Sequence, residues 1–218
     1  MKEQIVIFGA GGCGREIIWQ INSSSRLMKK YDIIGFVDDT ASLQKRKIDE
    51  FEVVGDTEWL IQYKYRIGVI VGVGNPFSRK IIYEKLKENE NIYFPTIVAD
   101  DVIIANSSTI GMGSFICMGT KILIDISIGD FFYAGIGCCI SHDNKISDFV
   151  TLYPNVNLSG NVTIEELVEI GTGVKIIPKV KIGQKVVIGA GAVVISDIPK
   201  DVLAIGVPAI IKKNTNFK

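Results

Sequence analysis

The chain has 218 residues, of which 47% are hydrophobic and 22% charged, an ordinary globular ratio that excludes a disordered chain. Lysine plus arginine and aspartate plus glutamate both number 24, so no net field favours nucleic acid or an anionic membrane surface. No stretch approaches the length of an uncharged apolar span, and the first apolar run is too short for a secretory signal. We therefore expect no membrane span.

The cysteines and the single histidine limit the metal and redox chemistry of the chain. The cysteines lie in apolar or glycine-rich surroundings without a Cys-x-x-Cys pattern: Cys13, Cys117, Cys138 and Cys139. We expect reduced, mostly buried thiols, a cytoplasmic protein and no metal. A disulfide between the adjacent Cys138 and Cys139 is the alternative. His142 is the only histidine, so imidazole chemistry has one possible position.

The first segment begins with the order strand, glycine loop, helix. Residues 4–8 form an apolar, β-branched run, Gly9–Gly14 match G-x-G-x-x-G, and residues 15–21 have apolar side chains at helical spacing. Such a loop lets backbone amides and a helix N-terminus approach a phosphate. The candidate residues in this loop are Gly11, Gly12 and Cys13. A tight turn with no ligand is the alternative.

Two further apolar runs end in polar or glycine-rich loops. Residues 32–37 are followed by two aspartates, and residues 67–71 are followed by a glycine-rich loop and a helical stretch at about 78–88. Parallel strands direct such loops to the edge where ligands bind. The candidates at this edge are Asp38, Asp39, Gly74 and Asn75. Because the segment lacks a second βαβαβ half, one nucleotide is favoured over NAD.

A six-residue period of apolar side chains runs through the second segment. Every sixth residue from Val98 to Val194 is apolar over seventeen consecutive positions, and glycine often follows the marked residue. A period of six fits a short strand plus a corner, with the aliphatic side chain inside and glycine permitting the bend. Three sides make a coil of 18 residues, and five to six coils stack at about 4.8 Å.

This hexad resembles the left-handed parallel β-helix of the hexapeptide-repeat transferases, and the left hand and the homotrimer are what that resemblance implies. We therefore expect an α/β half-Rossmann domain that binds a nucleotide sugar in residues 1–95. A left-handed β-helix acetyltransferase domain follows in residues 96–195. Residues 196–218 have lost the period and are expected to cap the helix.

The active-site segment resembles that of the NeuD/PglD-type sugar acyltransferases. The similarity lies in the stretch ISHDNKISDF at residues 140–149, in Pro154 and in SGNVTI at residues 159–164. The three loops of the first segment are similar to those of the family. Residues 188–194 and 206–209 are similar to its coenzyme A end. Cys13 departs from the family, where many members have histidine, and this puts a sugar contact by that side chain in doubt.

The resemblance implies a mechanism in which acetyl-CoA lies between two subunits of a homotrimer. His142 is the general base for the acceptor amine. Asp143 orients the imidazole or favours its protonated form, which requires a corner because adjacent strand residues point to opposite faces. Gly160, 18 residues after His142, supplies a backbone amide to the oxyanion. The alternatives are a solvated surface aspartate and a glycine demanded only by the coil bend.

The resemblance also implies a set of residues that contact the coenzyme. The cofactor-binding candidates are Thr151, Gly160, Gly171, Ala190 and Pro208. Backbone amides around Gly171 and Ala190 would line the pantetheine arm. Lys212 and Lys213 either meet coenzyme phosphates or belong to a solvated tail.

The function implied is acetyl transfer from acetyl-CoA to the amine of a UDP-, dTDP- or GDP-linked 4-amino-4,6-dideoxy sugar, within polysaccharide or glycoprotein glycan synthesis. The alternative in the same family is an O-acetyltransferase acting on sialic acid or a related sugar. The amine is favoured because the loops of the first segment offer a nucleotide pocket that a free sugar would not need.

Two other classes of function use comparable folds. A metal hydratase of the γ-carbonic anhydrase kind takes three histidine ligands, and this chain has one. A non-catalytic nucleotide-sensing or scaffold module remains the alternative from another class. It predicts that His142→Ala leaves ligand binding and biological output intact, whereas the enzyme predicts a loss of turnover.

Overall fold

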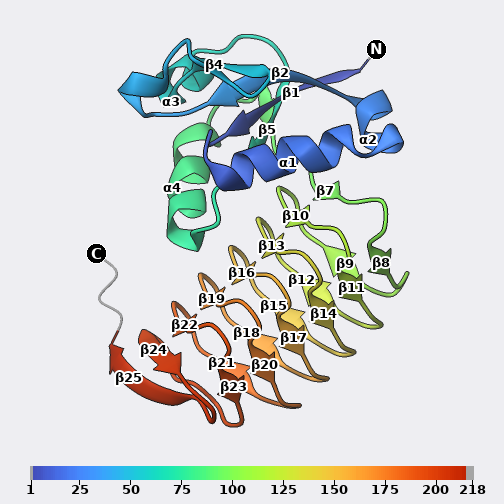
Figure 1. The fold of residues 1–218 in the computed structure, drawn as a ribbon, viewed down its shortest axis with the longest axis vertical. Coiled ribbons are helices and arrows are strands. Elements are labelled where there is room, and N and C mark those ends of the chain that lie inside the picture. The colour runs from blue at the N-terminus through green and yellow to red at the C-terminus, as the bar shows by residue number, and fades with distance from the viewer. Residues whose placement is uncertain (1, 215–218) are drawn as a thin grey trace. The chain divides into compact units, whose positions relative to one another are not determined.

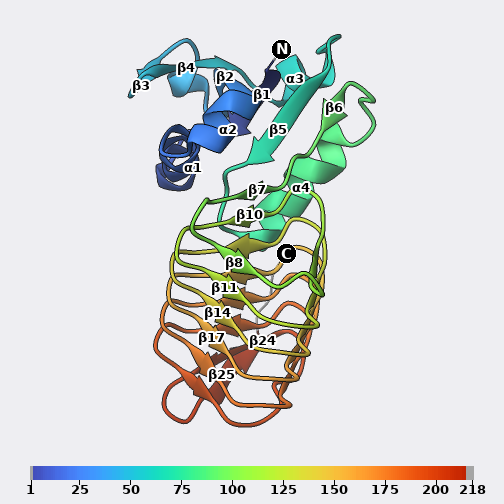
Figure 2. The same ribbon diagram turned by 90° about the vertical axis from the view of Figure 1, so that its right-hand side faces the viewer.

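The computed structural model of the chain describes residues 2–214. The chain divides into two compact units, Met1–Thr96 and Ile97–Lys218. Figure 1 and Figure 2 show a mixed α/β unit followed by a ladder of short strands. Each unit is described by itself.

The first unit is a six-stranded sheet with helices on its faces (Figure 1). Its strands are β1 (Glu3–Phe8), β2 (Tyr31–Val37), β3 (Lys47–Ile48), β4 (Phe51–Gly55), β5 (Ile67–Val71) and β6 (Ile92–Tyr93). Its helices are α1 (Gly12–Asn22), α2 (Ser25–Lys30), α3 (Thr57–Ile61) and α4 (Pro76–Leu86), with a 3₁₀ turn at Ala41–Leu43.

The strand order explains why three loops meet at one edge. The order is β3-β4-β2-β1-β5-β6, and β1 pairs in parallel with both β2 and β5. The carboxyl ends of these three central strands therefore lie together, as predicted. β5 is buried along its whole length, as expected of a strand covered on both faces. The sequence interpretation missed β3, β4, β6, α2 and α3.

Gly14 allows α1 to pack against the loop that precedes it. A Cβ at this position would collide with the carbonyl oxygen of Gly9 and lie 3.1 Å from its carbonyl carbon. Gly9 itself has φ +103°, a value that favours glycine. The third glycine of the motif thus serves the close approach of helix and loop.

Gly14→Ala should destabilise the first unit by about 1–3 kcal/mol, because the loop backbone has to move to admit the methyl group. Urea unfolding monitored by tryptophan fluorescence measures this change. Gly12→Ala is the matched control, since a Cβ there meets nothing within 4 Å. Equal stability of the two variants would contradict the packing role of Gly14.

The second unit is a stack of two-residue strands at a spacing of six residues (Figure 2). They are β7 (Ile97–Val98), β8 (Ile103–Ile104), β9 (Thr109–Ile110), β10 (Phe115–Ile116), β11 (Lys121–Ile122), β12 (Ser127–Ile128), β13 (Tyr133–Ala134), β14 (Cys139–Ile140), β15 (Lys145–Ile146), β16 (Thr151–Leu152), β17 (Asn157–Leu158), β18 (Thr163–Ile164), β19 (Glu169–Ile170), β20 (Lys175–Ile176), β21 (Lys181–Ile182), β22 (Val187–Ile188) and β23 (Val193–Val194).

Each of these strands pairs in parallel with the strand one coil away, as Ile122 of β11 does with Ile140 of β14. The pairs build three sheets, which are the three sides of a left-handed β-helix. The second residue of each strand belongs to the predicted aliphatic series. From Ile116 onward these side chains are buried in one continuous core. The predicted period and fold class are therefore confirmed.

The prediction that glycine after the aliphatic residue permits the bend is wrong. The positive φ angles fall three residues after the aliphatic residue, and several belong to other residue types: Asp125, Phe131, Asp143, Phe149, Asn155, Asn161, Leu167, Lys179 and Lys185. Gly129 directly follows its aliphatic residue and has no positive φ. A Cβ there would lie 2.8 Å from the amide nitrogen of Asp148. These glycines therefore permit the close approach of the next coil.

The last coils end in a short hairpin. β24 (Val202–Ile205) extends the sheet of β22 in parallel, and β25 (Ile210–Asn214) pairs antiparallel with β24. This hairpin stands where the cap was expected. The predicted tail also includes residues 215–218, which lie outside the described residues.

The structure was searched for membrane-spanning helices, disulfides and clusters of metal ligands. Within residues 2–214, no helix is long and apolar enough to cross a membrane. No disulfide joins any of the cysteines, and Cys117 and Cys138 are buried whereas Cys13 and Cys139 are half-buried. Across the same part of the chain, no group of three or more metal-ligating side chains gathers.

Candidate active site

The sole histidine lies at a corner of the β-helix beside its neighbouring aspartate. His142 follows β14, and its side chain is 53% exposed. Asp143 has φ +60°, which turns the chain so that its carboxylate meets the ring. His142 Nδ1 and Asp143 Oδ2 are 2.7 Å apart. The corner that this contact requires is therefore present.

The contact with Asp143 defines the tautomer of His142. An ionised carboxylate only accepts hydrogen bonds, so Nδ1 carries the hydrogen and donates it. Nε2 then holds a lone pair in the neutral ring. Among residues 2–214 no group is hydrogen-bonded to Nε2, so the exposed imidazole can take a proton there.

Gly160 lies one coil further on, against the imidazole. A Cβ on Gly160 would lie 2.6 Å from Nε2 of His142 and 3.0 Å from its Nδ1. Gly160 has no positive φ, so the coil bend does not require glycine here. The imidazole of His142 leaves little room for a side chain at this position, and the oxyanion role of Gly160 remains a prediction.

The backbone amide of Gly160 behaves like the amides at the same place in earlier coils. Within residues 2–214 it donates no hydrogen bond, whereas the amides of Ser159 and Asn161 donate to the carbonyls of Ile176 and His142. The amides of Ile124 and His142, two coils and one coil earlier in the same column, also donate none within these residues. The role of this amide as an oxyanion donor therefore remains a prediction.

The aspartates after β2 are bonded to the loops around them. The Asp38 carboxylate accepts from the amides of Ala10 and Thr40, both at 2.9 Å. The Asp39 carboxylate accepts from the amide and the hydroxyl of Thr57, both at 2.8 Å. Asp38 therefore joins the loop after β2 to the glycine loop, and the binding of a nucleotide sugar by these two aspartates remains a prediction.

The hydrogen bonds of Asp38 affect its ionisation. Partial burial alone raises the pKa of this carboxyl group, but the hydrogen bonds from Ala10 and Thr40 outweigh burial and lower the pKa below its usual value. A carboxylate with a depressed folded-state pKa stabilises the fold above the unfolded-state pKa of about 3.9.

Asp38→Asn should therefore reduce the free energy of unfolding at pH 7 by about 1 kcal/mol, the scale of a charged hydrogen bond at a partly exposed site. The difference in the free energy of unfolding between the wild type and Asp38→Asn should shrink as the pH falls through the folded-state pKa of Asp38. Below that pKa the wild-type carboxyl group is also neutral. Urea titrations from pH 7 to pH 3 measure both free energies. A difference independent of pH would show that the charge contributes nothing.

The loop after β5 is held by a residue that the sequence interpretation missed. Arg79 of α4 is 2% exposed, and its guanidinium donates to the carbonyls of Val73 at 3.0 Å and Gly74 at 2.7 Å. Asn75 caps α4 by accepting from the amide of Ser78. The sequence did carry a signal for the burial of Arg79, because Arg79 shares a helix face with the buried Ile82 and Leu86.

The coenzyme candidates fall into different surroundings. Gly171 and Ala190 are in contact across neighbouring coils, because a Cβ on Gly171 would lie 2.6 Å from the Ala190 amide nitrogen. Thr151 in β16 is fully buried, an environment typical of packing. Pro208 is exposed, and Lys212 and Lys213 are exposed in β25.

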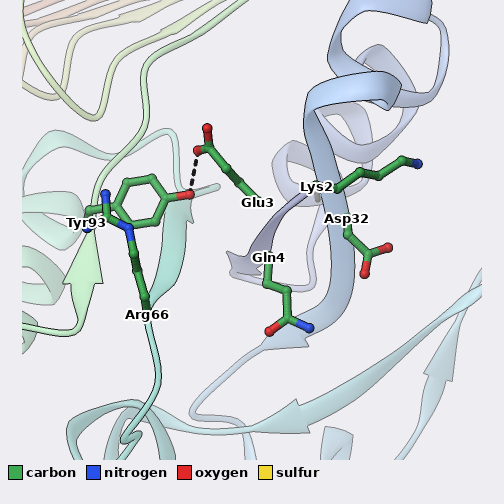
Figure 3. A pocket seen from close by; sticks show the side chains of 6 residues that line it. All are labelled: Lys2, Glu3, Gln4, Asp32, Arg66 and Tyr93. Carbon is green, nitrogen blue, oxygen red and sulfur yellow. Dashed lines mark hydrogen bonds between the residues drawn. The ribbon is translucent and has the colours of Figure 1, made fainter.

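A cavity of about 900 Å³ lies at the opposite edge of the first unit's sheet, where the strands begin (Figure 3). The Tyr93 hydroxyl donates to Glu3 at 2.8 Å, and Arg66 lies 4.7 Å from the Tyr93 ring centre. Burial, and then the hydrogen bond to Glu3, raise the pKa of Tyr93. The lining carries balanced charges from Lys2, Arg66, Glu3 and Asp32. This edge is distinct from that of the glycine loops.

Two comparisons match the sequence to known proteins. Residues 4–86 match the model of the PglD N-terminal domain. The chain is 32% identical over 157 residues to GDP-perosamine N-acetyltransferase of Escherichia coli O157:H7, covering 72% of this chain and 70% of that protein.

Solved structures match both units. One is perosamine N-acetyltransferase from Caulobacter crescentus, in which a histidine is replaced by asparagine, with CoA and GDP-perosamine; its TM-score is 0.87 at 28% identity, covering 97% of each chain. The other is the acetyltransferase domain of PglB from Neisseria gonorrhoeae with acetyl coenzyme A; its TM-score is 0.87 at 27% identity, covering 97% of this chain and all of that one.

The resemblance seen in the sequence is thereby confirmed over both units. The half-Rossmann sheet, the β-helix and the curated relative all indicate the same group of enzymes. The chain belongs to the NeuD/PglD-type hexapeptide-repeat sugar acyltransferases, a family of acetyl-CoA-dependent enzymes.

Proposed function

We propose that this protein transfers the acetyl group of acetyl-CoA to the amine of a nucleotide-linked 4-amino-4,6-dideoxy sugar, with His142 as general base. The observation that carries the proposal is the exposed imidazole that Asp143 holds against Gly160, whose Nε2 has no hydrogen-bond partner among residues 2–214. Acyl transfer to an amine needs a base, a hydrogen-bond donor for the oxyanion and room for a flat carbonyl group.

The relatives support the choice of an amine on a nucleotide sugar. The curated relative is a GDP-perosamine N-acetyltransferase, and a solved relative is described with CoA and GDP-perosamine. The first unit presents the glycine loop at the N-terminus of α1, where backbone amides favour a phosphate. A GDP-linked amino sugar is therefore the first substrate to test.

The chemistry follows from the protonation state of the imidazole. His142 Nε2 removes a proton from the acceptor nitrogen as that nitrogen forms a bond to the thioester carbonyl carbon. The Gly160 amide donates to the carbonyl oxygen as it gains negative charge. When the carbon–sulfur bond breaks, His142 returns its proton to the departing sulfur. Asp143 keeps the proton on Nδ1 throughout and stabilises the charged ring.

The face around His142 also supports a homotrimer with active sites between subunits. Leu123 and Ile177 occupy the same column of coil positions as Ser141, one coil before and two coils after it. Both are 39% exposed, and Ile124 beside Leu123 is 55% exposed. Exposed apolar side chains gathered on one face typically mark a protein interface. We propose that neighbouring subunits cover this face.

A thiol-release assay tests the activity, and light scattering tests the trimer. We expect the release of CoA and the appearance of an acetamide with acetyl-CoA and a GDP-, UDP- or dTDP-linked 4-amino-4,6-dideoxy sugar. Sialic acid forms the comparison arm, where an acetyl ester would favour the O-acetyltransferase instead. Thermal shift with NAD is a second comparison. Stabilisation by NAD with none by any nucleotide sugar would overturn the assignment of the first unit.

A further inference from the structure

Asn144 is a buried polar residue in a column of mostly small and aliphatic positions. It is fully buried, whereas the residues one and two coils further on in its column are Val162 and Val180. Burying an amide costs free energy unless its hydrogen bonds are made. The hydrogen bonds of Asn144 therefore show what the side chain does at this place.

The Asn144 amide joins two corners of neighbouring coils. Its Nδ2 donates to the Ser141 carbonyl at 2.6 Å and to the Ser159 carbonyl at 3.0 Å, with a longer contact of 3.4 Å to the His142 carbonyl. Its Oδ1 accepts from the Val162 amide at 3.0 Å. One corner carries His142 and the other carries Gly160.

Ser108 makes half of this pattern in the same column, two coils earlier. Its hydroxyl accepts from the Ile126 amide at 3.0 Å and donates to the Leu123 carbonyl at 2.6 Å. These partners lie 18 and 15 residues ahead, as Val162 and Ser159 do for Asn144. A short side chain at this column thus joins two coils wherever it is polar.

Unlike Ser108, Asn144 adds bonds to its own corner. Its donors reach back to the carbonyls of Ser141 and His142, a reach that the serine hydroxyl at 108 does not show. The His142 carbonyl also accepts from the Asn161 amide at 3.0 Å. The corner that carries the imidazole is therefore bonded from both sides to the corner that carries Gly160.

We propose that Asn144 is a positioning residue for the acetyl transfer, which holds the His142 corner in register with Gly160. This inference rests on the proposed function, because a base must stand within hydrogen-bond reach of the acceptor. A displacement of about 1 Å in such a group is enough to lower a rate on the order of 10²-fold. The side chain acts through the backbone of Ser141 and His142 and does not touch the substrate.

Asn144→Ser separates positioning from coil stability. Serine at this column makes both bonds between coils, as Ser108 shows, but loses those to the catalytic corner. We expect kcat to fall on the order of 10-fold or more while the KM for acetyl-CoA stays nearly constant. Ser108→Val is the matched control, because it breaks the same bonds between coils at a corner without a histidine, and its kcat should equal that of the wild type.

A second readout does not require turnover. His142 is the only histidine, so a protein freed of its purification tag shows one imidazole signal in nitrogen-resolved NMR spectra. Asn144→Ser should shift this signal, and Ser108→Val should leave it in place. The shift decides on positioning even if the proposed activity is absent, so failure of one proposal is distinguishable from failure of the other.

Two results would overturn the role of Asn144. One is an Asn144→Ser protein with wild-type kcat and an unmoved imidazole signal. The other is a Ser108→Val protein that loses as much activity as Asn144→Ser, which would show a general effect of weakening the coils. Asn144→Val removes all of the bonds, and a fold stable enough to assay should then show at least the loss seen with serine.

Discussion

His142→Ala is expected to lower kcat on the order of 10²-fold or more, because the acceptor amine would lose the base that takes its proton. The side chain is 53% exposed, so its removal should change the melting temperature little. Coenzyme binding should also persist, because the ring is proposed to act on the amine. Steady-state kinetics measure the loss, and calorimetric titration with CoA measures the binding.

The pH dependence of this variant carries further information. Without the imidazole, the reaction depends on acceptor molecules that are already deprotonated, and this fraction grows as the pH rises. The ratio of wild-type to variant kcat should therefore narrow toward alkaline pH. Lys145→Ala, which truncates an exposed side chain in the next strand, is the surface control. Turnover in His142→Ala equal to that of an active wild type would indicate deprotonation by water or by the substrate. Absence of acetyl transfer in both proteins would favour the non-catalytic module.

The β-helix was accessible to sequence analysis because its period is a direct consequence of its geometry. Each residue of the series from Val98 to Val194 ends a strand, and the series keeps one phase throughout. The corners were less accessible. Their positive φ angles are taken by Asp143, Phe149 and Leu167 as well as by glycine, so residue type alone does not mark the bend.

The residues of the candidate site also include some that the sequence predicted and some that it did not. Spacing placed Gly160 one coil after His142, and the family resemblance implied the roles that are proposed for them. The hydrogen bonds of Asp38, Arg79 and Asn144 were not predictable, because their partners belong to other loops or coils and are brought near only by the fold. Buried polar side chains are where such partners have to exist, so a polar residue on an apolar face was the signal available.

Gly160→Ala is expected to be nearly as damaging as loss of the imidazole. The new methyl group would stand 2.6 Å from His142 Nε2, too close for the ring to remain. The ring is the end of an exposed side chain, so the ring should move and the coil should stay folded. Alanine keeps the backbone N–H, so a fall of kcat on the order of 10²-fold would report the displaced base. Kinetics and thermal unfolding, measured on the same preparation, separate activity from stability.

A double-mutant cycle with His142→Ala tests the cause of this loss. If the methyl group acts by displacing the ring, it should cost little more once the ring is absent, and the two losses should be far from additive. Additive losses would show that Gly160 acts on the thioester independently of the base. Wild-type turnover in Gly160→Ala would contradict the close packing of ring and glycine itself. The cycle therefore decides whether these two residues, 18 positions apart in sequence, form one catalytic unit.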